Sequence, residues 1–243
     1  MNLFLTLAFL FFIGSVSGWV IELFFRRFFS SANPDRKWIN PGFCTGPYVP
    51  LYGFGLCILY LIARLEPYGW LEHPVWNRVL LFVIMAVCMT AIEYLAGLLC
   101  LKVARVRLWD YSDERWNVQG LICPKFSLAW AGLGAVYYFF IHPHILDALA
   151  WLSSNLAFSF VVGLFFGVFL VDAAQSIRLV DKLKQYAQAN NVVVRYETLK
   201  ADIRRKYDQT RKKYHFFRPF RTEYPLSEHI RASLEEIEKK IRR

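Results

Sequence analysis

Long runs of apolar residues, separated by short polar connections, fill the first 177 residues of the chain. One run, Leu3 to Ile21, has nineteen residues without a charge, and the run from 80 to 101 is interrupted only by Glu93. A helix that crosses a bilayer needs about 20 apolar residues, because its backbone polar groups must be hydrogen-bonded within the segment. The pattern predicts an all-α membrane protein with about five transmembrane helices, at 3–25, 45–63, 79–101, 126–141 and 148–171.

The second predicted helix has proline and glycine near its start, including Pro47, Pro50 and Gly53. Irregular backbone of this kind occurs at membrane depth only where protein or a water-filled cavity satisfies its polar groups. A re-entrant turn that leads into this helix is therefore an alternative to a full span.

Two glycine pairs, Gly14 with Gly18 and Gly163 with Gly167, have the spacing that puts both glycines on one helix face. Such a face lets another helix backbone approach closely, so each pair predicts a helix contact. Glycine is common in membrane helices, so a chance occurrence is the alternative.

Beyond residue 177 the pattern changes to that of a soluble helix, which divides the chain into a transmembrane domain (1–177) and a basic helical cytoplasmic tail (178–243). Residues 196–214 are charged nearly throughout, and apolar residues recur at helical spacing from Ile230 to Ile241. The tail is predicted either to lie near anionic lipid headgroups or to dock a cytoplasmic partner.

Composition supports a membrane protein, since 56% of the residues are hydrophobic and 18% are aromatic, above the usual range for soluble domains. The formal net charge of +10 would ordinarily suggest nucleic acid as a partner. However, residues 1–177 hold eleven Lys and Arg against ten Asp and Glu, while the tail holds eighteen against nine. The basic excess belongs to the tail, and we expect no nucleic-acid partner.

The connections between the predicted helices carry four, two, five and no Lys or Arg, and the basic tail follows. The positive-inside rule produces this alternation when the N-terminus lies outside the cell membrane and the C-terminus lies in the cytoplasm. We therefore expect a multi-pass protein of the cell membrane with an odd number of spans.

Enzyme motifs give no positive signal. The sequence contains no G-x-x-x-x-G-K-[ST], H-E-x-x-H or G-x-S-x-G, so whether the chain is an enzyme stays open and any ATPase must be a separate polypeptide. The five cysteines are scattered without a C-x-x-C pair, which favours neither a disulfide framework nor a zinc site. We expect no metal and no cofactor.

Two carboxylates, Glu22 and Glu93, lie within the predicted helices, where a charge is costly and usually turns toward a cavity or a partner. Glu22 has Arg26 four residues later, so a local ion pair is its simplest interpretation. Glu93 has no such neighbour, and a functional role or a buried network is favoured.

The two connections predicted on the inner side are rich in turn residues and polar groups. Because they flank both carboxylates, we expect one polar pocket at the cytoplasmic side, with the carboxyl of Glu93 within about 10 Å of residues 109–112 or of Glu22. The candidate substrate-binding residues are Glu22, Asn40, Tyr52, Glu93, Trp109, Asp110, Tyr111, Ser112, Asn117 and Gln119.

The order of these motifs resembles a family. Gly18-Trp19-x-x-Glu22, Asn40-Pro41-Gly42-Phe43, Gly46-Pro47-x-x-Pro50-x-Tyr52-Gly53, Glu93-x-x-x-Gly97, Trp109-Asp110-Tyr111-Ser112 and Asn117-x-x-Gly120-x-Ile122-Cys123 are similar to the bacterial membrane proteins called putative ABC-transporter type IV. The resemblance covers residues 8–177, and the chain departs from it in its long basic tail. It implies a permease-like polytopic protein by analogy of fold.

Three functions therefore stay open. In the leading one, transport, Glu22, Glu93 and Asp110 line an inward-facing cavity that binds a cationic or amphipathic solute or relays protons. In the second, an intramembrane enzyme acts on lipid-linked substrates, with Glu93 or Asp110 as general base. In the third, the chain is a non-catalytic membrane scaffold. The partners expected are membrane lipids, a separate ATPase subunit in the transport case, and a second copy of the chain as an alternative.

Overall fold

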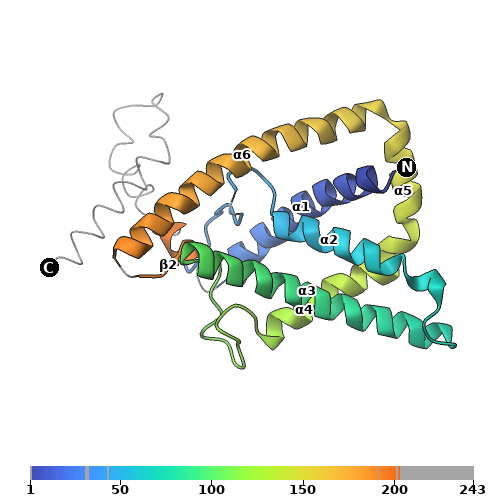
Figure 1. Cartoon of the computed structure of the whole chain (residues 1–243), viewed down its shortest axis with the longest axis horizontal. Coiled ribbons are helices and arrows are strands. Elements are labelled where there is room, and N and C mark those ends of the chain that lie inside the picture. The colour runs from blue at the N-terminus through green and yellow to red at the C-terminus, as the bar shows by residue number, and fades with distance from the viewer. Residues whose placement is uncertain (1, 31–32, 43, 191, 201, 203–243) are drawn as a thin grey trace.

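The computed structural model describes residues 2–30, 33–42, 44–190, 192–200 and 202 (Figure 1). The fold is helical, with two very short strands. The helices are α1 (Leu3–Phe28), α2 (Pro50–Ala63), η1 (Glu66–Tyr68), α3 (Pro74–Ala104), α4 (Pro124–Ala135), the π-helical η2 (Val136–Ile141), α5 (His142–Ser154) and α6 (Leu156–Ala189). The strands β1 (Val106–Arg107) and β2 (Val194–Arg195) pair in parallel.

Three helices in the described part of the chain are long and apolar enough to cross a membrane: α1, α3 and residues 157–189 of α6. They support a membrane location. α2 has 14 residues and so measures about 21 Å at 1.5 Å per residue, which is shorter than the hydrocarbon core of about 30 Å. The total of five spans therefore stays a prediction.

All five predicted segments differ from the helices in their bounds, and in two of them the difference has a local cause. The second does not begin at residue 45, because Val49 precedes a proline and is extended, so the helix begins at Pro50. The last, predicted over 148–171, is divided at Asn155. The side chain of Asn155 donates to the carbonyl of Trp151 at 2.7 Å, and its extended backbone ends α5 and begins α6.

Helices α1 and α2 pack closely through one of the two glycine pairs. A Cβ on Gly14 would lie 2.8 Å from the Tyr52 carbonyl, and one on Gly18 would lie 2.2 Å from the Tyr52 ring. Only glycine leaves room for this approach, as predicted from the spacing. A Cβ on Gly163 or Gly167 would meet no described atom within 4 Å, so the second pair makes no such contact in the described chain.

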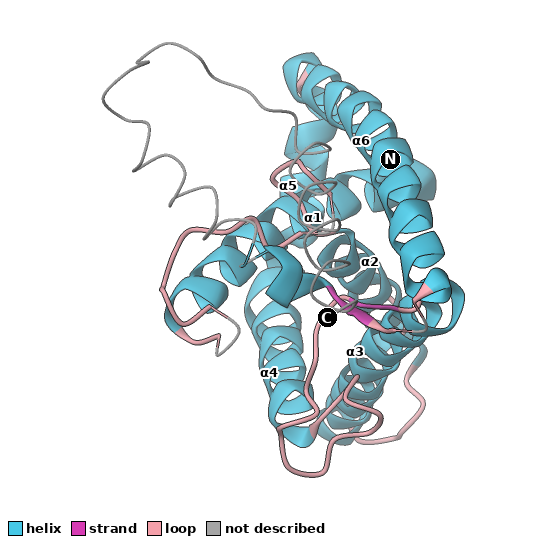
Figure 2. Cartoon of the chain, turned by 90° about the vertical axis from the view of Figure 1, so that its left-hand side faces the viewer, coloured by secondary structure: helices cyan, strands magenta, loops and turns pink. Residues whose placement is uncertain are grey.

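The loops that were predicted on one side lie together in space. In Figure 1, α1, α3 and α6 end and α2 and α4 begin toward the same end of the molecule, which also holds residues 105–123 and the described residues between 29 and 49. We call this the site end. Figure 2 looks toward it and shows the two strands beside the last turns of α3. The opposite end holds the connection 64–73 and α5.

One face of α3 is buried along most of its length. Buried residues recur every four positions on this face: Asn77, Leu81, Met85, Met89, Glu93 and Gly97. The apolar members Leu81, Met85 and Met89 are at most 2% exposed and belong to the main hydrophobic core, together with Leu10 of α1. The core thus separates Asn77, toward the opposite end, from Glu93, at the site end.

The chain returns to the bundle after α6. This helix continues through residue 177 without a break, and residues 192–200, the return segment, then form β2 and a helical turn. Leu183 and Tyr196 pack with Ala104 and Val106 in a second small core. The division of the chain at residue 177 stays a prediction, and the helical patterns predicted beyond residue 202 lie outside the described residues.

Candidate functional site

A cavity of about 940 Å³ opens at the site end. Its walls come from α1, α2, α3 and α4, from both loops of this end and from the return segment. Its polar lining residues include Glu22, Arg26, Tyr52, Glu93, Trp109, Asp110, Tyr111 and Glu197. Aromatic and aliphatic side chains cover the remaining wall.

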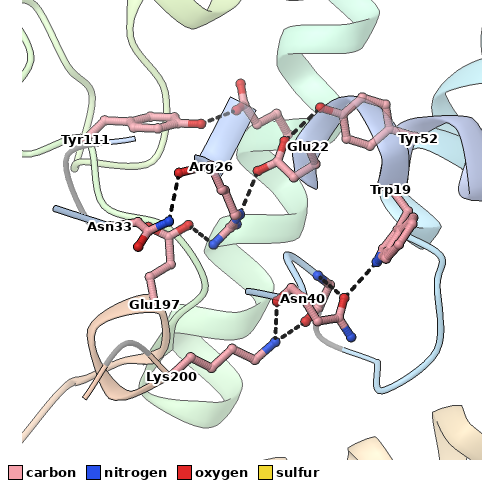
Figure 3. Close-up of polar contacts among 11 residues, drawn as sticks. Trp19, Glu22, Arg26, Asn33, Asn40, Tyr52, Tyr111, Glu197 and Lys200 are labelled. Atoms are coloured by element: carbon pink, nitrogen blue, oxygen red, sulfur yellow. Dashed lines mark hydrogen bonds and ion pairs between the residues drawn. The ribbon is translucent and has the colours of Figure 1, made fainter. Parts of the chain in front are cut away.

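Glu22 makes two contacts through its carboxylate. Oε1 accepts from Arg26 Nε at 3.1 Å, one helical turn later, and Oε2 accepts from the Tyr52 hydroxyl at 3.0 Å (Figure 3). The first contact confirms the ion pair predicted from the four-residue spacing. The second depends on Gly18, which lets the Tyr52 ring lie against α1.

Arg26 joins Glu22 to the return segment. Its Nη1 lies 2.5 Å from Oε1 of Glu197, and both side chains are at most 20% exposed (Figure 3). Burial and the charge of Glu22 raise the pKa of Glu197, while Arg26 opposes that rise. The Arg26 guanidinium therefore forms ion pairs with both Glu22 and Glu197.

Lys200 attaches the same segment to the first loop. Its ammonium nitrogen donates to the carbonyl of Asn40 at 3.1 Å and to the carbonyl of Gly42 (Figure 3). Burial and the nearby charge of Arg26 lower its pKa to about 7. The Arg26–Glu197 ion pair and the contacts of Lys200 thus hold the return segment against α1 and the first loop.

Glu93 is 3% exposed and faces the cavity from α3. Its Oε1 accepts from the Tyr111 hydroxyl at 3.1 Å (Figure 3), which is well within the predicted 10 Å. Its Oε2 has no hydrogen-bond partner among the described residues. The indole of Trp130 faces this carboxylate without reaching hydrogen-bond geometry. Glu93 therefore holds a buried acceptor that the described protein leaves unsatisfied.

Two polar residues fix the first loop. Asn40 accepts from the Trp19 indole at 2.8 Å and donates to the carbonyls of Cys44 and Thr45 at 3.1 and 2.9 Å. Asp172 of α6 accepts from the backbone of Thr45 and Gly46 at 3.1 and 2.8 Å. These contacts hold the loop between α1 and α6.

The second loop is closed by its own side chains. Asp110 accepts from Arg107 at 3.0 Å and from the Ser112 backbone at 3.1 Å, and these partners with Arg195 lower its pKa against the effect of burial. Arg195 Nε lies 3.0 Å from Asp110 Oδ2 as an ion pair, without hydrogen-bond alignment. Asn117 accepts from the Gly120 backbone at 2.9 Å.

Of the ten candidate residues, six line the cavity: Glu22, Tyr52, Glu93, Trp109, Asp110 and Tyr111. The other four, Asn40, Ser112, Asn117 and Gln119, lie in the loops but do not line it. Gln119 is exposed and has a positive φ of 56°, so its role is in the turn before Gly120. Whether the six bind a substrate stays a prediction.

Sequence reasoning missed three residues of this region: Asp172, Glu197 and Lys200. Asp172 carried a usable signal, because it is the first charge after the last apolar run. Glu197 and Lys200 lie in a segment that resembles an ordinary solvated helix, and nothing local indicates its return to the bundle. In the part of the chain that the structure describes, no three His, Cys, Asp or Glu side chains converge as a metal site would require.

A family model described as putative ABC-transporter type IV matches residues 9–177. The chain belongs to this family. The match confirms the resemblance drawn from the motifs, and it contains Glu22, Glu93, Asp172 and both loops of the site end. It ends before the return segment, so Glu197 and Lys200 lie outside it. No curated protein and no solved structure matches the chain at a significant level.

Proposed function

We propose that this protein is a permease-like, membrane-spanning component of a transport system, and that its site-end cavity binds the transported solute from the cytoplasm. The observation that carries the proposal is Glu93, a buried carboxylate that lines a cavity of about 940 Å³ and has one oxygen without a hydrogen bond among the described residues. Intramembrane carboxylates that face a cavity are typical of solute pathways. The family to which the chain belongs supports the same class of function.

A second cavity supports transport over a scaffold. A volume of about 1010 Å³ opens at the opposite end, lined by residues that include Thr6, Tyr60, Glu66 and Asn77. The buried face of α3 reaches from Asn77 to Glu93 and is closed between them by apolar side chains. A cavity at each end of one bundle, with a packed barrier between, suits a protein that opens to each side in turn.

The proposal needs a source of energy on another polypeptide, since the sequence holds no P-loop. The loops of the site end and the return segment form the surface nearest to the cavity, and we propose them as the contact for an ATPase subunit.

An intramembrane enzyme is the second candidate. Tyr111 donates to Glu93 Oε1, as a partner that positions a general base would.

The test combines mass spectrometry with one substitution. We expect a small solute to copurify with the protein from native membrane extract. The same solute should be taken up by proteoliposomes that contain the protein together with its ATPase subunit. Glu93→Gln keeps the shape of the side chain and should lower the bound solute about tenfold or more, with an unchanged melting temperature. Asp147→Asn removes an exposed carboxylate of α5 and should change neither the amount of bound solute nor the melting temperature.

Two results would contradict transport. A copurifying lipid-linked molecule that is chemically converted in the presence of the protein would favour the enzyme. A loss of thermal stability in Glu93→Gln, parallel to its loss of binding, would reduce Glu93 to a structural role, because removing one partner from a buried network is strongly destabilising.

A further inference from the structure

The charges around the site-end cavity are unbalanced. Among the described residues, six carboxylates line it but only two cationic side chains do. The carboxylates are Glu22, Glu93, Asp110, Asp113, Glu114 and Glu197, and the cations are Arg26 and Lys125. A cavity with this lining attracts positive charge, because its low-dielectric walls focus the field of the carboxylates.

Most of these carboxylates already have a cationic partner. Arg26 pairs with Glu22 and Glu197, and Lys125 lies 2.6 Å from Glu114. Asp110 pairs with Arg107 and Arg195, two arginines that do not line the cavity. Glu93 has no ion-pair partner among the described residues, and its Oε2 accepts no hydrogen bond there. A buried carboxylate is expensive unless it is paired. The missing partner can therefore be a ligand that carries a positive charge into the cavity.

Four aromatic rings share the cavity with this carboxylate. Tyr111 stacks on Phe126 with ring centroids 4.2 Å apart, and Tyr52 packs against Trp130 with centroids 4.7 Å apart. All four rings line the cavity. The faces of aromatic rings attract cations, and most strongly those that have shed their water. Rings beside a carboxylate suit an organic cation better than a hydrated metal ion.

The wall formed by α3 is apolar. It consists of Ile92, Leu95, Ala96, Leu99 and Cys100, which recur on one helix face beside Glu93. Leu95 and Leu99 are 61% and 64% exposed. In a membrane-spanning helix, exposed side chains of this kind meet lipid, so the cavity wall continues onto the lipid-facing surface. A ligand that dissolves in the membrane can reach Glu93 along this wall.

We propose that the ligand of the site-end cavity is a lipophilic organic cation, whose charged centre lies beside Glu93 within the four aromatic rings and whose apolar part lies against α3. This proposal rests on the proposed function, since it names the class of solute for the same cavity. A cavity of about 940 Å³ is within the range that holds a ligand of drug size.

Two probes of equal shape and opposite charge test the proposal without altering the protein. Tetraphenylphosphonium is a lipophilic cation, and tetraphenylborate is its anionic counterpart. We expect the full-length protein in nanodiscs to bind tetraphenylphosphonium above the level of empty nanodiscs, and tetraphenylborate not to bind above it. Equilibrium dialysis measures both. Glu93→Gln should weaken binding of the cation at least tenfold, and Asp147→Asn should leave it unchanged, at equal melting temperatures.

Binding of both probes alike, or of neither, would overturn the proposal, as would undiminished cation binding by a folded Glu93→Gln variant. If the cation binds through Glu93 but is not taken up by proteoliposomes that contain the protein with its ATPase subunit, the proposed ligand class is supported and transport is contradicted. If solute uptake depends on Glu93 but the protein does not bind tetraphenylphosphonium, transport is supported and the proposed ligand class is contradicted.

Discussion

A single aspartate joins the first loop of the site end to α6. Asp172 is 6% exposed and accepts from the Thr45 hydroxyl at 2.7 Å, from two backbone N–H groups and from the Tyr48 hydroxyl. Because hydrogen bonds to a charged acceptor contribute more than neutral ones, Asp172→Asn should lower the free energy of unfolding by about 1.5–3 kcal/mol. Thermal unfolding in detergent measures this change.

The control for Asp172 is Asp147→Asn, which removes a carboxylate from an exposed position of α5 and should leave the melting temperature unchanged. Equal stability of the two variants would mean that the contacts of Asp172 do not hold the loop.

Short-range residue contacts could be predicted from the sequence, whereas long-range contacts could not. The pair of Glu22 with Arg26 follows from helical spacing, and the approach of Tyr111 to Glu93 follows from putting both on one side of the membrane. Asp172 and Thr45 are 127 positions apart. Neither spacing nor composition indicates such a pairing, because it depends on how α6 packs against the other helices.

At the scale of elements, the contact between α1 and α2 depends on closely packed glycines, of which Gly18 is one. A Cβ at Gly18 would lie 2.2 Å from the Tyr52 ring, which must then move away from Glu22. Overpacking of this kind typically costs about 1–3 kcal/mol. Gly18→Ala should therefore lower thermal stability and weaken ligand binding in the cavity that Tyr52 lines, as measured by melting in detergent and equilibrium dialysis.

A matched substitution is available on α6. Gly163→Ala puts the same methyl group where no described atom lies within 4 Å, and it should not lower stability. If both variants melt at the same temperature, close packing at Gly18 is not a determinant of the fold.

Element boundaries were less predictable than the elements themselves. Hydropathy located α1 and α3 because each holds a long apolar run with charged residues beyond it. It could not divide the last run, because Asn155 interrupts the helix through its backbone rather than through a change in hydropathy. The return segment was missed for a related reason, since β1 and β2 are two residues each and give no periodic signal.

At the scale of the whole molecule, the distribution of Lys and Arg predicts an orientation that the structure does not test. The loops of the site end carry more cations than the connection at the opposite end, so we expect the site end to face the cytoplasm. A fluorescent reporter fused after Arg243 should be active in the cytoplasm, and a periplasmic alkaline phosphatase fused there should be inactive. The opposite pattern would place the cavity on the outer side.

The buried face of α3 has a further consequence for how the molecule can move. Its members recur every four residues from Asn77 to Gly97, so neighbouring positions along the face are about one helical turn apart, or 5.4 Å. A sliding of α3 by one turn would bring Met89 near the place of Met85 and carry Glu93 into the level that Met89 now holds. Discrete one-turn steps of this kind are known in switching proteins. Such a step would move Met85 and Met89 into positions of similar volume, because methionine and leucine fill similar spaces. It would also carry the Glu93 carboxylate into the apolar core that contains Met89.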